Sequence, residues 1–114
     1  MTLEQARKAL KRAESIIETS YALTNEVKLL PIALEQAQRA MMLTWKCSGK
    51  EKKPKVLEDM EKLLEERKKS PVEFQRKQKL VLWKQNKKIT IIEEKTVRDY
   101  IQKTKVYLEK TQNA

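Results

Sequence analysis

The first residues in this chain that could do chemistry are carboxylates. Glu58, Glu61 and Glu65 recur every three to four residues, so a helix over 55–69 would place them on one face. Carboxylate oxygens hold phosphate-bound Mg²⁺, as an all-helical nucleotide pyrophosphohydrolase would require. Such a site needs a second carboxylate pair facing the first. Glu73 stands alone, and the later acidic residues lack the matching spacing, so we predict no metal site.

Histidine is absent from the chain, which removes most familiar hydrolytic chemistry. Without imidazole there is no Ser-His or Cys-His nucleophile pair, no imidazole base and no histidine metal ligand. Cys47 is the single cysteine, so it can form neither an internal disulfide nor a zinc cluster with other cysteines. We therefore predict that Cys47 packs in the core as a small hydrophobic residue. One glycine cannot make a glycine-rich phosphate loop. We therefore expect a non-enzymatic protein with no catalytic residue, metal or cofactor.

Positive charge is concentrated in one stretch of the chain. The net charge is +10, and residues 67–88 carry nine basic side chains against one acid, Glu73. A concentrated basic field favours polyanions such as RNA, DNA or an acidic protein surface. Trp83 lies inside this stretch and could stack on an unpaired base. The predicted contacts with nucleic acid or another polyanion are Arg76, Lys79, Trp83, Lys84, Lys87 and Lys88.

The same stretch permits a second interpretation, in which the lysines are solvated and only keep the protein soluble. Leu80 and Trp83 would then form a buried contact with another subunit or a protein partner. Only 39% of the residues are hydrophobic, and these two side chains have no obvious cover within one chain, so we expect a homodimer. The two interpretations differ in whether the side chain of Trp83 is solvent-exposed or buried in the assembled protein.

A central helix is predicted over residues 70–88. Ser70, Pro71 and Glu73 form a capping box with proline at the first helical position. One face of this helix is apolar, and the opposite face mixes basic and apolar groups. The apolar face carries Phe74, Val81, Leu82 and Ile89, and the mixed face carries Arg76, Lys79, Leu80, Trp83 and Lys87.

The runs LVLW and ITII allow a different local structure, because both are rich in residues that favour strands. They could form two short strands around KQNKK. That connection lacks an Asn-Gly type of turn, and Thr90 with Glu93 makes another capping box. We therefore prefer a break near Ile89 and a last helix over residues 91–111.

The remaining helices are predicted over residues 3–21, 31–47 and 55–69. A capping box from Thr2 to Gln5 begins the first helix, whose apolar residues then repeat at helical spacing. Ser48 and Gly49 end the second. Alanine stripes on the first two helices allow close approach. The expected fold is all-α: a single domain over residues 1–114, folded as an antiparallel bundle of four to five helices.

Several segments resemble the HEPN superfamily of small, mostly prokaryotic helical bundles. They are the alanine stripe Ala6, Ala9, Leu10 and Ala13, the segment ALEQAQRAM over residues 33–41, the leucine segment over 57–64, and a final helix with tyrosines. The resemblance covers most of the chain and implies an antiparallel bundle that is often dimeric. Nuclease members use an arginine followed shortly by a histidine. This chain has no histidine, so the resemblance implies a non-catalytic partner or binding subunit.

No apolar run approaches the length of a membrane span, and the N-terminal residues lack the apolar core of a signal peptide. We therefore expect a cytoplasmic protein that does not contact membranes. Charged residues make up 37% of the chain, mostly Lys and Glu, a bias that is typical of proteins from hot-living organisms.

Overall fold

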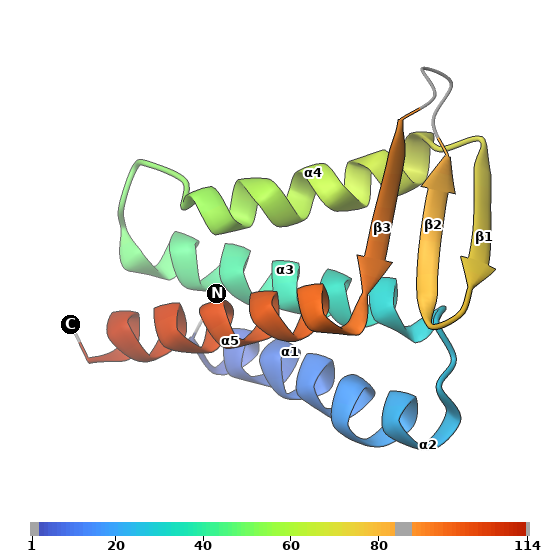
Figure 1. The fold of residues 1–114 in the computed structure, drawn as a ribbon. Coiled ribbons are helices and arrows are strands. Elements are labelled where there is room, and N and C mark those ends of the chain that lie inside the picture. The colour runs from blue at the N-terminus through green and yellow to red at the C-terminus, as the bar shows by residue number, and fades with distance from the viewer. Residues whose placement is uncertain (1–2, 84–87, 114) are drawn as a thin grey trace.

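The computed structural model describes residues 3–83 and 88–113 and combines helices with a small sheet. The helices lie side by side, and the sheet stands at one end of them with its strands running across their direction (Figure 1). The helices are α1 (Leu3–Ser15), η1 (Ile16–Tyr21), α2 (Ala22–Thr24), α3 (Leu29–Ser48), α4 (Lys55–Lys69) and α5 (Glu94–Gln112). The strands are β1 (Val72–Arg76), β2 (Lys79–Trp83) and β3 (Ile89–Glu93).

The predicted first helix forms, but its last part is wound differently. After α1 the chain continues as η1, a π-helix, and then as the short α2. Asn25 ends this stretch with a φ of 55°, the left-handed conformation that asparagine tolerates better than most residues. Its backbone N–H donates to the carbonyl oxygen of Tyr21 at 2.7 Å. The helical stretch is therefore closed by its own backbone.

Helix α3 begins at Leu29, two residues before the predicted start at Pro31. Proline is tolerated there because the first-turn N–H groups of a helix have no partner within the helix. Gly49 ends α3 with a φ of 71°, as its place after Ser48 predicts. Helix α4 follows Pro54 and covers the predicted residues.

The core lies between α1, α3 and α5. Alanines line the contact of α1 with α3, which lets the two helices approach closely. Larger side chains fill the space toward α4 and α5, among them Leu34, Met41, Leu57, Met60 and Val97, all of them buried. In the part of the chain that the structure describes, no helix is both long and apolar enough to cross a membrane.

The sheet is antiparallel with the strand order β1-β2-β3. A two-residue turn, Lys77 and Gln78, joins β1 to β2, with Lys77 at a φ of 56°. Phe74 lies opposite Val81, which in turn lies opposite Ile91. This register decides which side chains share a face of the sheet.

The prediction of an all-α bundle is wrong, because residues 72–76, 79–83 and 89–93 form strands rather than helices. The strand pair LVLW with ITII is the correct local structure, and Leu80 lies opposite Ile92 in it. β-branched and aromatic side chains pack well on a pleated surface; all four residues of ITII are β-branched, and LVLW contains Val81 and Trp83. The last helix consequently begins at Glu94 instead of residue 91.

Two of the predicted capping boxes do not cap helices. Ser70 follows the end of α4 in an extended conformation, and Glu73 lies in β1, where its carboxylate accepts from Arg67 at 2.9 Å. Thr90 lies in β3 and donates to Glu66 of α4 at 3.0 Å. In both places the polar side chains link the sheet to α4.

Candidate nucleic-acid interface

The sheet has two faces of different character. Side chains alternate between the faces of a strand, so the register assigns each residue to one of them. Leu80, Leu82 and Ile92 point toward the helices and are buried in the core. We call the opposite side the outer face; it consists of Val72, Phe74, Arg76, Lys79, Val81, Trp83, Ile89, Ile91 and Glu93.

The centre of the outer face is apolar and open. Ile89 is 59% exposed and Trp83 is 48% exposed, and Val72, Phe74 and Ile91 are exposed as well. Val81 is the exception, because its cross-strand neighbours Phe74 and Ile91 cover it from both sides. Isolated exposed apolar residues are ordinary, but a contiguous exposed group of this kind is a candidate binding surface.

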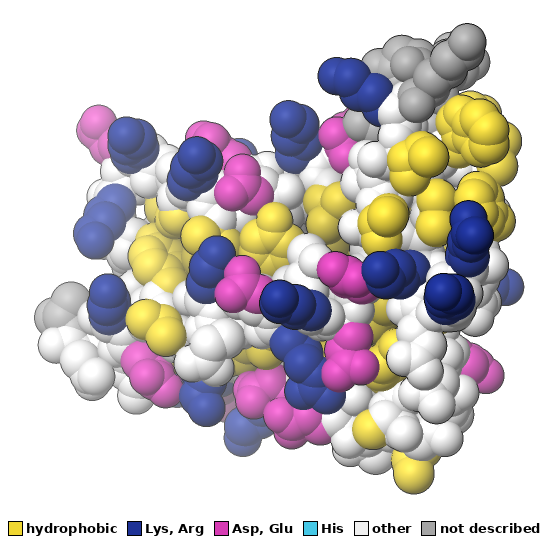
Figure 2. All heavy atoms as spheres, viewed as in Figure 1, with side chains coloured by type: hydrophobic (Ala, Val, Ile, Leu, Met, Phe, Trp, Pro, Cys, Tyr) yellow, Lys and Arg dark blue, Asp and Glu magenta, His cyan; other side chains and the backbone are white. Residues whose placement is uncertain are grey.

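Cations stand at both ends of this apolar group. Arg76, Lys77 and Lys79 lie at the turn between β1 and β2, and Lys88 lies just before β3 at the other end. Glu93, the one acid among the described residues of the outer face, pairs with Lys79 at 3.4 Å. Hydrophobic side chains gather over the three strands, with basic groups beside the turn (Figure 2).

A shallow groove of about 310 Å³ crosses the outer face. It extends from the turn between β1 and β2 to Ile89 at the start of β3, so apolar and basic groups line it together. Its lining residues are Phe74, Arg76, Lys77, Lys79, Val81, Ile89 and Ile91. A ligand in this groove would contact flat apolar surface and cations at once.

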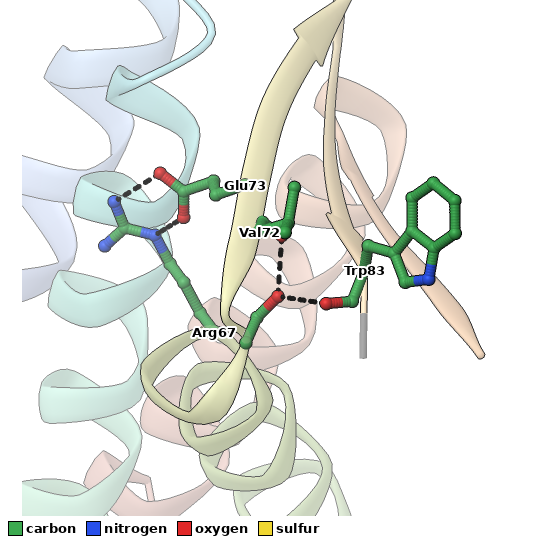
Figure 3. A network of polar contacts seen from close by, with 5 residues as sticks. Arg67, Val72, Glu73 and Trp83 are labelled. Atoms are coloured by element: carbon green, nitrogen blue, oxygen red, sulfur yellow. Dashed lines mark hydrogen bonds and ion pairs between the residues drawn. The ribbon is translucent and has the colours of Figure 1, made fainter. Parts of the chain in front are cut away.

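Hydrogen bonds at the end of β2 fix the position of Trp83. The hydroxyl of Ser70 lies 2.7 Å from the carbonyl oxygen of Val72 and 2.9 Å from that of Trp83. The indole projects away from the sheet, on the side opposite the Arg67–Glu73 ion pair (Figure 3). The aromatic ring is thus exposed while its backbone is held in place.

The structure brings together three of the predicted contact residues: Arg76, Lys79 and Trp83 all lie on the outer face. Lys88 is exposed just before β3. Lys84 and Lys87 lie outside the described residues. The sheet gathers Arg76, Lys79 and Trp83 on one surface, although the predicted central helix is absent.

Leu80 does not share that surface. It points to the inner face, where it is 3% exposed and belongs to the core. This corrects the expectation that Leu80 and Trp83 form one contact, since neighbouring residues of a strand point to opposite faces.

Four exposed apolar residues of the outer face were missed by the sequence prediction as members of the site: Val72, Phe74, Ile89 and Ile91. The alternation Val72-x-Phe74 and Ile89-x-Ile91 is the signal that could have identified them, because period two is typical of strands. The helical assignment concealed that alternation.

The other candidates for chemistry in the sequence were the carboxylates of α4 and Cys47. Within residues 3–83 and 88–113 no group of three His, Cys, Asp or Glu side chains is placed to hold a metal ion. Glu61 pairs with Lys53 at 2.9 Å, and Glu65 pairs with Lys69 at 3.6 Å. The prediction that Cys47 is buried is wrong, because its side chain is exposed near the end of α3.

Comparison with known proteins yields no match: no family model, curated protein or solved structure is significantly similar to this chain. The resemblance to the HEPN superfamily stays a prediction.

Proposed function

We propose that this protein binds single-stranded nucleic acid on the outer face of its sheet. The observation that carries the proposal is the exposed indole of Trp83 on an apolar surface with cations at both ends. Unpaired bases stack on aromatic side chains, and lysines and arginines neutralise the phosphates between them. The protein's excess of positive charge suits the same partner.

The arrangement favours a single strand over a duplex. A duplex hides the flat faces of its bases in the stack and presents phosphates along its surface, which an apolar platform cannot bind favourably. A single strand can turn its bases toward Trp83 and Phe74 while its phosphates reach the cations at the turn. Lys79 and Trp83 are four residues apart on β2, or about 14 Å, so one extended strand can contact both.

Substitutions at Trp83 test the stacking contact most sharply. Trp83→Phe keeps an aromatic ring, whereas Trp83→Leu keeps an apolar side chain and loses the ring. Stacking contributes about 1–3 kcal/mol per base, so Trp83→Leu should weaken binding about ten- to a hundredfold and Trp83→Phe much less. Fluorescence anisotropy with labelled single-stranded RNA, single-stranded DNA and duplex oligomers measures these affinities.

The charge contacts are tested separately by a salt series. Arg76→Gln removes one cation of the outer face, so the salt slope of single-strand binding should fall by roughly 0.7. Lys110→Gln is the matched control, because Lys110 is exposed near the far end of α5 and its loss changes the net charge equally. Equal effects of the two variants would mean that net charge alone drives binding.

Two results would contradict the proposal. One is the absence of single-strand binding at low salt. The other is a Trp83→Leu variant that binds nucleic acid as the unmodified protein does but loses thermal stability or dissociates an oligomer. The second result would assign the apolar surface to a contact with another protein.

A further inference from the structure

Strand β1 is exposed to an unusual degree. All five of its residues are exposed, including Glu73 and Gln75, which face the helix side of the sheet. β1 is the strand farthest from the helices and forms one edge of the sheet (Figure 1). An open edge strand with apolar residues such as Val72 and Phe74 is a template for pairing with another strand.

The turn determines which backbone groups of β1 are available. A two-residue turn closes on a hydrogen-bonded pair, here Arg76 with Lys79. Hydrogen-bonded and non-hydrogen-bonded pairs alternate along the ladder, so Phe74 and Val72 also bond toward β2. Ser70, whose hydroxyl reaches the carbonyl oxygens of both Val72 and Trp83, agrees with this assignment. The N–H and C=O groups of Glu73 and Gln75 therefore point outward from the edge.

The opposite edge of the sheet is less accessible. Helix α4 lies beside β3, where Thr90 donates to Glu66 at 3.0 Å. Ile91 lines a shallow pocket together with Asp59, Lys62 and Leu63 of α4. A strand added beside β3 would collide with these side chains of α4, whereas a strand added beside β1 would pair with the open edge of the sheet.

We propose that β1 pairs with β1 of a second copy of this chain, antiparallel, with a twofold axis at Phe74. In this register Glu73 lies opposite Gln75 of the second copy, and Gln75 lies opposite its Glu73. Both pairs use the outward-pointing backbone groups and exchange both of their hydrogen bonds. Phe74 meets Phe74 of the second copy in a non-hydrogen-bonded pair, which brings the two rings together on the outer face.

The charges of β1 suit this register. Glu73 faces the neutral Gln75, and Arg76 faces Val72, so no like charges stand directly opposite each other. Glu73 is also neutralised by Arg67 within its own chain, at 2.9 Å.

The neighbouring registers are worse. An axis at Glu73 would put two carboxylates opposite each other and would pair Gln75 with Pro71, which has no N–H to donate. An axis at Gln75 would pair Glu73 with Lys77, which lies in the turn at a φ of 56° and cannot continue the ladder. The axis at Phe74 is the register in which both outward-pointing residues find extended partners.

Such a dimer would have one six-stranded sheet with a continuous outer face. Five strand spacings of about 4.8 Å make this face about 24 Å wide between its outermost strands. The dimer leaves Trp83 of each copy exposed, so it is compatible with the proposed nucleic-acid binding and would extend its surface. It forms without nucleic acid, and its tests are therefore independent of that function.

The first test uses sedimentation velocity over a micromolar concentration series without nucleic acid. Gln75→Pro removes an outward-pointing N–H that β2 does not use, so the hairpin should persist while pairing between copies is lost. Gln75→Ala is the matched control, because it keeps the N–H. We expect dimers for the unmodified protein and for Gln75→Ala, and monomers for Gln75→Pro with an unchanged circular dichroism spectrum.

The second test detects the twofold axis directly. In a Cys47→Ser background, Phe74→Cys places two thiols opposite each other in a non-hydrogen-bonded pair, where the Cα atoms are about 4.5 Å apart and a disulfide can form. Mild oxidation should give a covalent dimer. Arg76→Cys is the control and should give none, because Arg76 faces Val72 in this register.

Three results would overturn the proposal. The first is a monomer at every concentration. The second is a dimer that Gln75→Pro leaves intact. The third is cross-linking through residue 76 that equals cross-linking through residue 74.

Discussion

The buried hydroxyl of Tyr21 leads to a sharp prediction about stability. Tyr21 ends η1 and is 2% exposed, yet its Oη finds no hydrogen-bond partner in the part of the chain that the structure describes. A buried polar group without a partner costs about 1–3 kcal/mol. Tyr21→Phe removes the hydroxyl and keeps the ring, so the free energy of unfolding should rise by about 1 kcal/mol. The melting temperature should rise by about 4 °C.

The stabilisation that Tyr21→Phe produces should grow at alkaline pH. Burial raises the pKa of Tyr21 above its ordinary value, and the negative charge of Glu94 raises it further. Between the unfolded and the folded pKa the folded state holds a proton that the unfolded state has lost, so stability falls as pH rises above about 10. The slope from one such group is at most about 1.4 kcal/mol per pH unit. Tyr21→Phe should remove this loss.

Urea unfolding between about pH 7 and about pH 11 measures both effects. Tyr100 is the internal reference, because burial also raises its pKa and the negative charge of Asp59 raises it further. Tyr100→Phe should therefore remove a separate part of the alkaline loss. A Tyr21→Phe variant that is less stable at neutral pH would contradict this expectation, because it would mean that the hydroxyl has a bonding partner.

Two further substitutions test the sheet. Leu82→Ala should lower the free energy of unfolding by about 2–5 kcal/mol because Leu82 is fully buried on the inner face, and Val72→Ala on the exposed outer face should cost less than about 1 kcal/mol in the same urea titration. Lys77→Gly should raise stability by about 0.5 kcal/mol, since glycine relieves the left-handed strain of the turn at a φ of 56° but has more entropy to lose on folding. A loss of stability in the thermal melt of Lys77→Gly would contradict that account of the turn.

The helices could be predicted from local pattern, because alanine stripes, Pro54 and Gly49 mark their faces and ends. The strands could not, for a geometric reason. Phe74 and Val81 are seven residues apart. That separation is about two turns of a helix, and it also places these two residues opposite each other in the β1–β2 hairpin. Both structures make them neighbours. The burial of Leu80 and Leu82, on the opposite face from Val81, separates the two cases.

The predicted contact residues stayed together for a related reason. Arg76 and Lys79 are three residues apart, so they share a helical face, and in the sheet they are the pair that closes the turn. Trp83 lies four residues beyond Lys79, an even number that keeps both on one side of β2. Leu80 is adjacent to Lys79 and turns inward. Pairing between strands depends on contacts that local spacing does not encode.

The sheet is formed by three consecutive strands, so one short stretch of chain, residues 72–93, carries the whole outer face. Within that stretch alternate positions obey different constraints. Leu80, Leu82 and Ile92 must preserve the fold, while their sequence neighbours Val81, Trp83 and Ile91 face outward. Substitutions at every second position can therefore change the chemistry of the outer face while the helical core stays intact. In the course of evolution, this short segment could acquire a different surface without the rest of the protein changing.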